Sequence, residues 1–425
     1  MAIDKFKSFL FEEISAAPLI VFRFAFGLMM FLSLVRFAAN GWIDTLYLQP
    51  KFFFPFYGFD WIKPLSAEGM YWVFGIMMLA SILVAFGVLY RISILTFFLM
   101  FTYVELIDKS NYLNHYYFIS IVAFLLCLLP FGKKVPRWAV LTLQLQMAIV
   151  YFFAGIAKLN SDWLLNAMPL KIWLASKTDL PLVGNLLTQD WIAFAFSWCG
   201  MLFDVGIAFF LFNRRTVWYA YAVVVVFHIL TAILFPMIGV FPFIMIVCAT
   251  VFLPESFHQK ALSVLSVRSQ KSDSKVDPHL SIQRNFVLSI FAIHFLIQIL
   301  LPLRSHFYSG NLFYHEQGYR FSWRVMLMEK AGLVFFHVRN AAGKLVEVNN
   351  RNFLTMQQEK QMSTQPDMIL QFAHNLQKIY NTSEVYAEAY VTVNGRSSQL
   401  LIDPNQNLCA VNDNFKNKNW VLVPE

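Results

Sequence analysis

A lysine at the end of an apolar segment is the residue of this sequence best suited to catalysis. Lys158 lies in the stretch YFFAGIAKLNSDW and closes a predicted apolar helix that begins near Arg137, and Asp162 and Trp163 follow within five residues. Burial disfavours the charged form of a lysine, so a lysine removed from water can act as a general base near neutral pH. The alternative is structural, because a lysine at the end of a membrane helix commonly extends its ammonium group toward the headgroups.

Four more polar side chains interrupt apolar segments. Arg23 lies in the first of them and Asp204 in GMLFDVGIAFFLF, and the economical interpretation is a structural ion pair between the two that fixes helix packing. His115 begins one segment and His228 lies within another. Each histidine alone is best explained by a satisfied hydrogen bond between helices. Together with Lys158 they could instead line one cavity, which sequence spacing does not decide.

The elements that must position these residues are membrane helices. Hydrophobic residues make up 58% of the 425 and charged residues only 14%, against roughly 45–50% and about 25% in soluble domains. Windows long enough, or nearly so, to cross a bilayer occur at 17–37, 69–90, 92–107, 115–131, 138–157, 190–212, 216–235, 237–254 and 286–303. We therefore predict an all-α polytopic membrane bundle of about nine transmembrane or re-entrant helices. Pro236 and Pro242 allow the eighth to be re-entrant.

The placement of Lys and Arg predicts the orientation of the bundle. With the N-terminus inside, the inner segments hold thirteen of these residues and the outer loops six, as the positive-inside rule requires. Nine spans then place the C-terminus outside. The N-terminal segment lacks the features of a cleavable signal peptide, and the polar segment 266–279 is predicted to be a flexible inner loop. We expect an integral membrane protein, in a bacterial inner membrane if the source is bacterial, with a cytoplasmic N-terminus and a periplasmic C-terminal domain. The net charge of +8 follows from this topology, so no nucleic-acid partner is expected.

The chain changes character after the last apolar window. We divide it into a transmembrane catalytic domain, residues 1–303, and a small extracytoplasmic α+β domain, residues 304–425. In the second part, LVFFHVRNAAGKLVEVN predicts a hairpin and residues 367–380 have helical periodicity. Alternating residues around Asn394-Gly395 predict a second hairpin.

Common catalytic and metal motifs are absent. The sequence has no CxxC, HExxH, P-loop or GxSxG pattern, so zinc hydrolysis, nucleotide hydrolysis and serine esterase chemistry have no support and no metal is expected. Cys127, Cys199 and Cys248 lie within apolar windows, where small packing residues are the simplest explanation.

Many segments of this chain resemble segments of the vitamin K-dependent gamma-glutamyl carboxylases and their bacterial relatives with the horizontally transferred transmembrane (HTTM) domain. They occur in the same order and at similar spacing. The similar segments are LYRIS, IDKSNYLNHYYF, VYFFAGIAKLNSDW, LFDVGIAFFLF, FH followed by FPMIG, LPLRSHF, GYRFSWRVML and DPNQNLCAVNDNFKNKNWVLV. The resemblance covers nearly the whole chain, and the lysine segment is its most specific part.

The resemblance implies an enzyme that couples two reactions. A reduced quinone, vitamin K hydroquinone or menaquinol, is oxidised by O2 to its epoxide, and Glu side chains are carboxylated by CO2. In the family scheme an uncharged lysine deprotonates the hydroquinone, and a strongly basic alkoxide then forms out of water and removes a glutamate γ-proton. Lys158 matches this lysine. His115 matches a histidine that orients or stabilises the quinol anion.

The implied partners are a Glu-containing protein or peptide, the lipid bilayer and a lipid-soluble quinone. A quinone suits a dry, apolar pocket with a few convergent polar groups. Interfacial anchoring is the alternative role for the two arginines among the candidate substrate-binding residues. These candidates are His228, Arg304, His306, Tyr319, Trp323 and Arg324.

Two other functions stay open at this point. One is a quinol epoxidase or oxygenase that carboxylates nothing. The resemblance does not extend to the C-terminal extension and the cysteine pair of the animal enzymes, so recognition of a propeptide is not expected. The other is a non-enzymatic transporter or channel. Transporters favour internal repeats with broken helices in matching halves, and the sequence has no convincing repeat.

Overall fold

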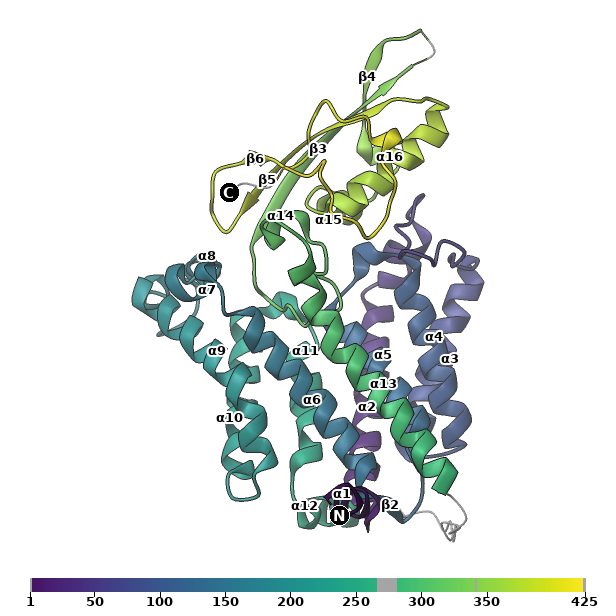
Figure 1. Ribbon diagram of the computed structural model, residues 1–425, viewed down its shortest axis with the longest axis vertical. Helices are drawn as coiled ribbons and strands as arrows, with labels where there is room; N and C mark the ends of the chain where they lie inside the picture. The colour runs from purple at the N-terminus through teal and green to yellow at the C-terminus, as the bar shows by residue number, and fades with distance from the viewer. Residues whose placement is uncertain (1, 266–280, 341, 423–425) are drawn as a thin grey trace.

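The computed structural model describes residues 2–265, 281–340 and 342–422. Long helices stand side by side in a bundle, and a smaller part that holds the larger sheet lies over one end of it (Figure 1). The chain begins at the opposite end, at α1 (Ala2–Phe11). We call the end beneath the sheet the domain side of the bundle. The predicted loop at 266–279 lies outside the described residues.

Seven of the described helices are long and apolar enough to cross a membrane, so the protein is an integral membrane protein. They are α2 (Ala17–Ala39), α3 (Ala67–Phe86), α4 (Tyr90–Ile107), α6 (Arg137–Ala157), α9 (Asp190–Phe212), α10 (Val217–Leu234) and α13 (Ser281–Leu303).

The two remaining predicted windows form shorter helices, so nine full spans are not present among the described residues. The helix α5 (Asn114–Leu128) has 15 residues. The segment that begins with α11 (Phe241–Ala249) meets α12 (Glu255–Leu265) at 115° and forms an eighth span only if the two are taken together. Leu129 and Leu253, which end the two short segments, are extended because each precedes a proline.

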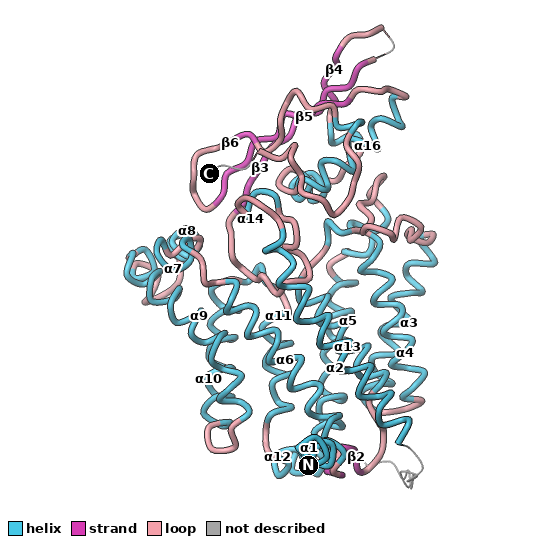
Figure 2. The backbone as a smooth tube through the Cα atoms, viewed as in Figure 1, coloured by secondary structure: helices cyan, strands magenta, loops and turns pink. Residues whose placement is uncertain are grey.

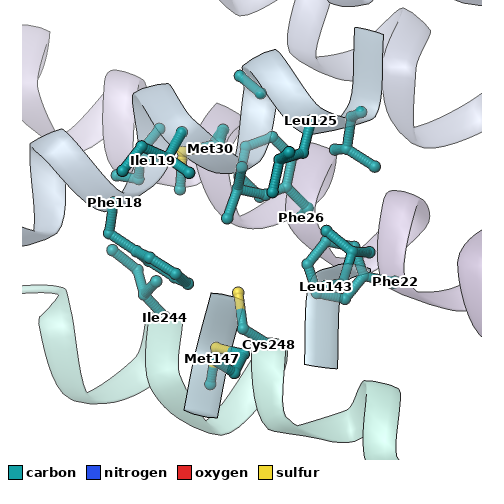
Figure 3. Close-up of a cluster of buried hydrophobic side chains, with 14 of the residues drawn as sticks. Phe22, Phe26, Met30, Phe118, Ile119, Leu125, Leu143, Met147, Ile244 and Cys248 are labelled. Carbon is teal, nitrogen blue, oxygen red and sulfur yellow. The ribbon is translucent and has the colours of Figure 1, made fainter. Parts of the chain in front are cut away.

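Glycines let helices approach closely at two crossings. A Cβ atom at Gly27 of α2 would lie 2.5 Å from the Ser81 carbonyl oxygen of α3, and one at Gly155 of α6 would lie 2.6 Å from the Val205 nitrogen of α9. Small residues at helix crossings are typical of membrane bundles. Large apolar side chains of α2, α5, α6 and α11 interlock nearby in the buried core (Figure 3). Gly155 brings the end of α6 against α9.

The larger sheet has four antiparallel strands in the order β4-β3-β5-β6. Side chains alternate between a buried and an exposed face along β3 and β5, and α15 and α16 pack nearby. Strands lie almost entirely in this part of the molecule, apart from the short pair β1 and β2 near the opposite end (Figure 2). The bounds are β1 (Glu13–Ser15), β2 (Lys134–Pro136), β3 (Lys330–Arg339), β4 (Leu345–Val348), α15 (Met356–Met362), α16 (Pro366–Tyr380), β5 (Val385–Val393) and β6 (Gln399–Leu400).

The predicted fold class is confirmed: a helical membrane bundle is followed by a small α+β part. The helix predicted at 367–380 is α16. The hairpin predicted at Asn394-Gly395 joins β5 to β6, and both turn residues have positive φ angles, 52° and 74°. Positive φ at both central positions is what favours Asn-Gly in a two-residue turn.

Partly buried ion pairs join the α+β part to the bundle. Asp367 at the start of α16 lies 2.7 Å from Lys109 Nζ and 2.8 Å from Arg320 Nη1. Burial alone would raise the pKa of the Asp367 carboxyl, but Arg320 and Lys109 hold it well below its usual range. A second link pairs Asp162 with Arg396.

Candidate functional site

Lys158 lies directly after α6 and is held in a buried ion pair. Its side chain extends back along the helix, so that Nζ lies 3.2 Å from the Ala154 carbonyl oxygen and 2.7 Å from Asp204 Oδ2 on α9. The exposed fractions of the two charged side chains are 8% and 9%. The close crossing at Gly155 brings the two helices near enough for this contact. Lys158 therefore does not extend toward the headgroups.

The predicted ion pair between Arg23 and Asp204 is wrong. The Asp204 carboxylate is occupied by Lys158, whereas the Arg23 guanidinium lies 5.2 Å from the centre of the Tyr90 ring and 5.0 Å from that of Phe131. Cation–π contacts of this kind stabilise an arginine near aromatic faces. The sequence could not identify the partner of Asp204, because two cations on different helices were available to it.

A cavity of about 320 Å³ lies against the Lys158–Asp204 pair. Its polar wall groups include these two side chains, Tyr151 and His228, and most of the remaining wall is aliphatic or aromatic. The Tyr151 hydroxyl and His228 Nε2 are 3.0 Å apart, within hydrogen-bond distance. The structure thus places His228 and Lys158 in one cavity.

Trp163 and Phe241 are two of the aromatic residues on this wall, and Phe241 connects it to His115. Trp163 belongs to the short helix α7 (Ser161–Asn166), and its ring centre lies 5.3 Å from Lys158 Nζ. Phe241 lies 6.1 Å from His228 and 5.9 Å from His115, measured between ring centres. His115 is buried but does not line the cavity. His115 thus contacts a residue of the cavity wall, Phe241, and does not itself line the cavity.

The segment 321–326 forms part of the same wall and has an uncommon backbone. Phe321, Trp323 and Met326 have positive φ angles of 54–60°, a region that side chains other than glycine rarely adopt and that clusters at functional sites. The residues around His115 support the segment. Asn114 Nδ2 donates to the Arg324 carbonyl oxygen at 2.9 Å, and the Tyr112 hydroxyl accepts from the Phe321 amide at 2.8 Å.

A second cavity, of about 510 Å³, lies at the domain side near the end of α6. Its polar wall includes Asp162, His306, Arg324 and Arg396. Arg324 Nη2 donates to Ser305 Oγ at 2.8 Å, while its Nε is buried without a partner among the described residues. Burial lowers the pKa of the Arg324 guanidinium. This cation has no described carboxylate partner, so the cavity is suited to an anion.

Three predicted substrate-binding residues lie away from both cavity walls. Trp323 is 1% exposed and stacks on Tyr117 with ring centres 5.0 Å apart. Arg304 donates to the Arg320 carbonyl oxygen. Tyr319 packs at the edge of the core beneath the sheet. Their contacts support the surrounding structure, and no substrate contact is indicated for them.

Sequence reasoning missed three contributors to the apolar cavity. The prediction pairs Asp204 with Arg23 instead. Tyr151 precedes Lys158 by seven residues, about two helical turns, and this spacing on one helix face is the signal that identifies it. Met326 belongs to an irregular segment that periodicity does not reveal. Within the described parts of the chain, no three His, Cys, Asp or Glu side chains gather as metal ligands.

Two family models match the chain. The HTTM domain model matches residues 11–134 and 130–257, and the model for the lumenal domain of vitamin K-dependent gamma-carboxylase matches residues 283–425. No solved structure matches the chain.

Proposed function

Since the chain belongs to the vitamin K-dependent gamma-carboxylase family, we propose that it couples oxidation of a reduced quinone by O2 to carboxylation of Glu side chains by CO2. The observation that carries this proposal is the pairing of two unlike cavities. Ala157 and Arg324 line the polar one, and their neighbours Lys158 and Val325 line the apolar one. Quinol and Glu substrate would thus be held at two sites that meet at the neighbouring residue pairs Ala157–Lys158 and Arg324–Val325.

The apolar cavity fits a quinol ring. Ligand sites of this size are mostly apolar with a few convergent polar groups, and Lys158, Tyr151 and His228 are such groups here. The bound quinol, reduced vitamin K or menaquinol, would supply the electrons that reduce O2 and thereby the driving force to remove a weakly acidic glutamate proton. The surrounding side chains, including Trp163 and Phe241, exclude water that would quench a strong base.

Lys158 would accept the quinol hydroxyl proton at Nζ, with Asp204 as its proton partner. Lys158 is a base only when uncharged. Transfer of a proton from Nζ to Asp204 Oδ2, 2.7 Å away, turns a charged pair into a neutral one without loss of a proton to water. A buried site of low polarity favours neutral pairs more than water does.

The two histidines have different places in this proposal. His228 and the Tyr151 hydroxyl lie on the cavity wall and would hold an oxygen of the ring by hydrogen bonds. His115 reaches the cavity only past Phe241, whose ring contacts both histidines. We therefore assign His115 a positioning role toward the quinol.

The polar cavity would hold the Glu substrate. Arg324 has no carboxylate partner among the described residues, and His306 lies on the same wall. Hydrogen bonds from a guanidinium to a carboxylate are shorter and stronger than those between neutral groups. We propose that the domain side faces outside, as the Lys and Arg asymmetry predicts. A reporter fused after Glu425 that is active only in the cytoplasm would contradict this orientation.

The test supplies purified protein with reduced menaquinone or vitamin K, O2, labelled bicarbonate and Glu-containing peptides. Epoxide together with label in the peptide is the expected result. Epoxide without label would leave a quinol epoxidase as the function. Absence of both products, with protein that remains folded, would contradict the proposal.

A further inference from the structure

A third cavity, of about 350 Å³, lies on the other side of α5 from the Lys158 site. Residues of α4, α5 and α13 line it, and the connection between α2 and α3 supplies Phe56 and Phe59. Tyr117 of α5 lines this cavity, whereas His115, two residues earlier, contacts Phe241 at the Lys158 cavity. Trp323 stacks on Tyr117 and is fully buried between the two regions.

Two polar side chains of α4 face this cavity without partners. Thr102 Oγ1 is buried and has no hydrogen bond among the described residues. Glu105, three residues on, lines the same wall, and no described residue forms a hydrogen bond or ion pair with its carboxyl. Ionisable residues within membrane-spanning helices are rare and usually serve a function, and Glu105 lies in the last turn of α4. A bound ligand would satisfy both groups.

The opposite wall carries a chain of hydrogen bonds that ends in a free donor. His294 Nε2 lies 2.9 Å from Gln146 Oε1, Gln146 Nε2 donates to Gln298 Oε1, and Gln298 Nε2 donates to the Tyr117 hydroxyl at 3.0 Å. Because Tyr117 accepts this bond, its own hydroxyl proton is available to the cavity. Ser120 supplies another hydroxyl to the same wall.

We propose that this cavity binds a neutral aromatic ring with hydrogen-bonding oxygens, a molecule of the quinone or quinol class, at a site separate from Lys158. Aromatic side chains, among them Phe98, Phe124 and Phe321, supply flat apolar walls for such a ring. Thr102 and Glu105 on one wall and Tyr117 on another supply partners for its oxygens.

The wall composition disfavours a phospholipid headgroup. The ammonium group of a phosphatidylethanolamine could pair with Glu105, but its phosphate would enter the same cavity, and no lysine or arginine lines it. A neutral ligand avoids this unpaired charge at membrane depth. This site does not require Lys158 to act as a base, so it stands apart from the proposed function.

The experiment measures how many equivalents of ligand bind to the wild type and to a variant in which a large side chain fills the cavity. Purified protein in quinone-free phosphatidylcholine nanodiscs is titrated with a naphthoquinone that carries a short isoprenoid tail. Ser120→Trp places a large ring in the cavity and should remove one equivalent of bound naphthoquinone relative to the wild type. Ala292→Trp adds the same ring to an exposed position of α13 outside the cavity, and should bind as many equivalents as the wild type.

A second variant, which keeps the shape of the side chain, tests the site even if Ser120→Trp misfolds. Thr102→Val keeps the shape and removes one hydroxyl, so the affinity of that one equivalent should fall roughly 3- to 10-fold, as for the loss of one hydrogen bond. The difference of one equivalent is expected whether or not the Lys158 cavity binds quinone. Equal stoichiometry in wild type and Ser120→Trp would overturn the proposal. Native mass spectrometry that finds a phospholipid lost from Ser120→Trp, and not displaced by the naphthoquinone in the wild type, would also overturn it.

Discussion

Lys158 and Asp204 form one buried ion pair, with 2.7 Å between Nζ and Oδ2. A lysine meant only to anchor a helix would need neither the burial nor the partner. Removal of one member of a buried ion pair leaves an uncompensated charge that costs about 3–5 kcal/mol of stability. A substitution that tests Lys158 as a base must therefore preserve the ion pair with Asp204, so that loss of activity is not caused by loss of stability.

Lys158→Arg is the sharper test of the general base. The guanidinium can still pair with Asp204, so the protein should stay folded, but it remains protonated at any usable pH. Quinol oxidation should fall to background. Lys158→Ala should also be inactive, with a lower yield of folded protein because Asp204 loses its partner. An arginine variant that forms epoxide at the wild-type rate would rule out the proton-acceptor role.

Epoxide formation and carboxylation, measured on the same variants, should distinguish the roles of His228 and His115. His228→Ala removes a hydrogen-bonding group from the cavity wall, and a loss on the order of 10²–10³-fold in epoxide formation is expected. His115→Ala should give a smaller loss, because His115 contacts the cavity wall at Phe241 and does not line the cavity itself. Both losses should appear equally in carboxylation, which shares the quinol step. Loss of carboxylation alone in His115→Ala would place that histidine with the Glu or CO2 site.

At the scale of elements, the segment 321–326 is the part that the two proposed substrates share. Ser322 and Arg324 line the polar cavity, and Val325 and Met326 line the apolar one. The long helices around it follow from apolar windows and were predictable. The three positive φ angles were not, because none of these residues is the glycine that signals such a backbone. Contacts from α5 hold the segment, and such contacts leave no periodic pattern in the sequence.

Arg324→Lys should impair use of the peptide while epoxidation in the absence of peptide continues. Loss of the guanidinium fork removes charge-assisted hydrogen bonds, and KM for a Glu-containing peptide should rise roughly 10- to 100-fold. Arg304→Lys is the matched control, because Arg304 lies off both cavities. Measurement of KM for both variants decides the assignment, and an equal rise in each would contradict a specific role for Arg324.

For the whole molecule, the sequence predicted a helical membrane bundle followed by a small α+β part. It did not predict which partners meet across helices. Lys158 with Asp204, and Lys109 with Asp367, join residues 46 and 258 positions apart. Charge and hydropathy identify such residues as polar groups in need of partners, but several partners satisfy the same need. Only the packing of the helices selects one.

The Asp367 links should make the attachment of the α+β part sensitive to acid. Because the pKa of Asp367 is held well below its ordinary value of 3.8, its contribution to stability is present above about pH 4 and is lost as the pH falls below that. Asp367→Asn should therefore lower the melting temperature at pH 7 and flatten its decline between pH 5 and pH 3.

Glu384→Gln is the control for this measurement. Glu384 also forms an ion pair, with Arg339 at 2.8 Å, but on the surface, where such pairs contribute about 0–1 kcal/mol. Its melting curve should follow that of the wild type at every pH. Equal behaviour of the Asp367 and Glu384 variants would show that the buried links do not hold the two parts together.

A substitution at Gly155 would disrupt the Lys158 site without altering any polar side chain. A methyl group there would lie 2.6 Å from the Val205 nitrogen and 3.0 Å from the Asp204 carbonyl carbon, so α6 and α9 would have to separate where the Lys158–Asp204 contact bridges them. An alanine at this position would thus push the two helices apart and break the Lys158–Asp204 contact through the bulk of one methyl group. Loss of the Lys158–Asp204 contact therefore need not involve a change in any polar residue.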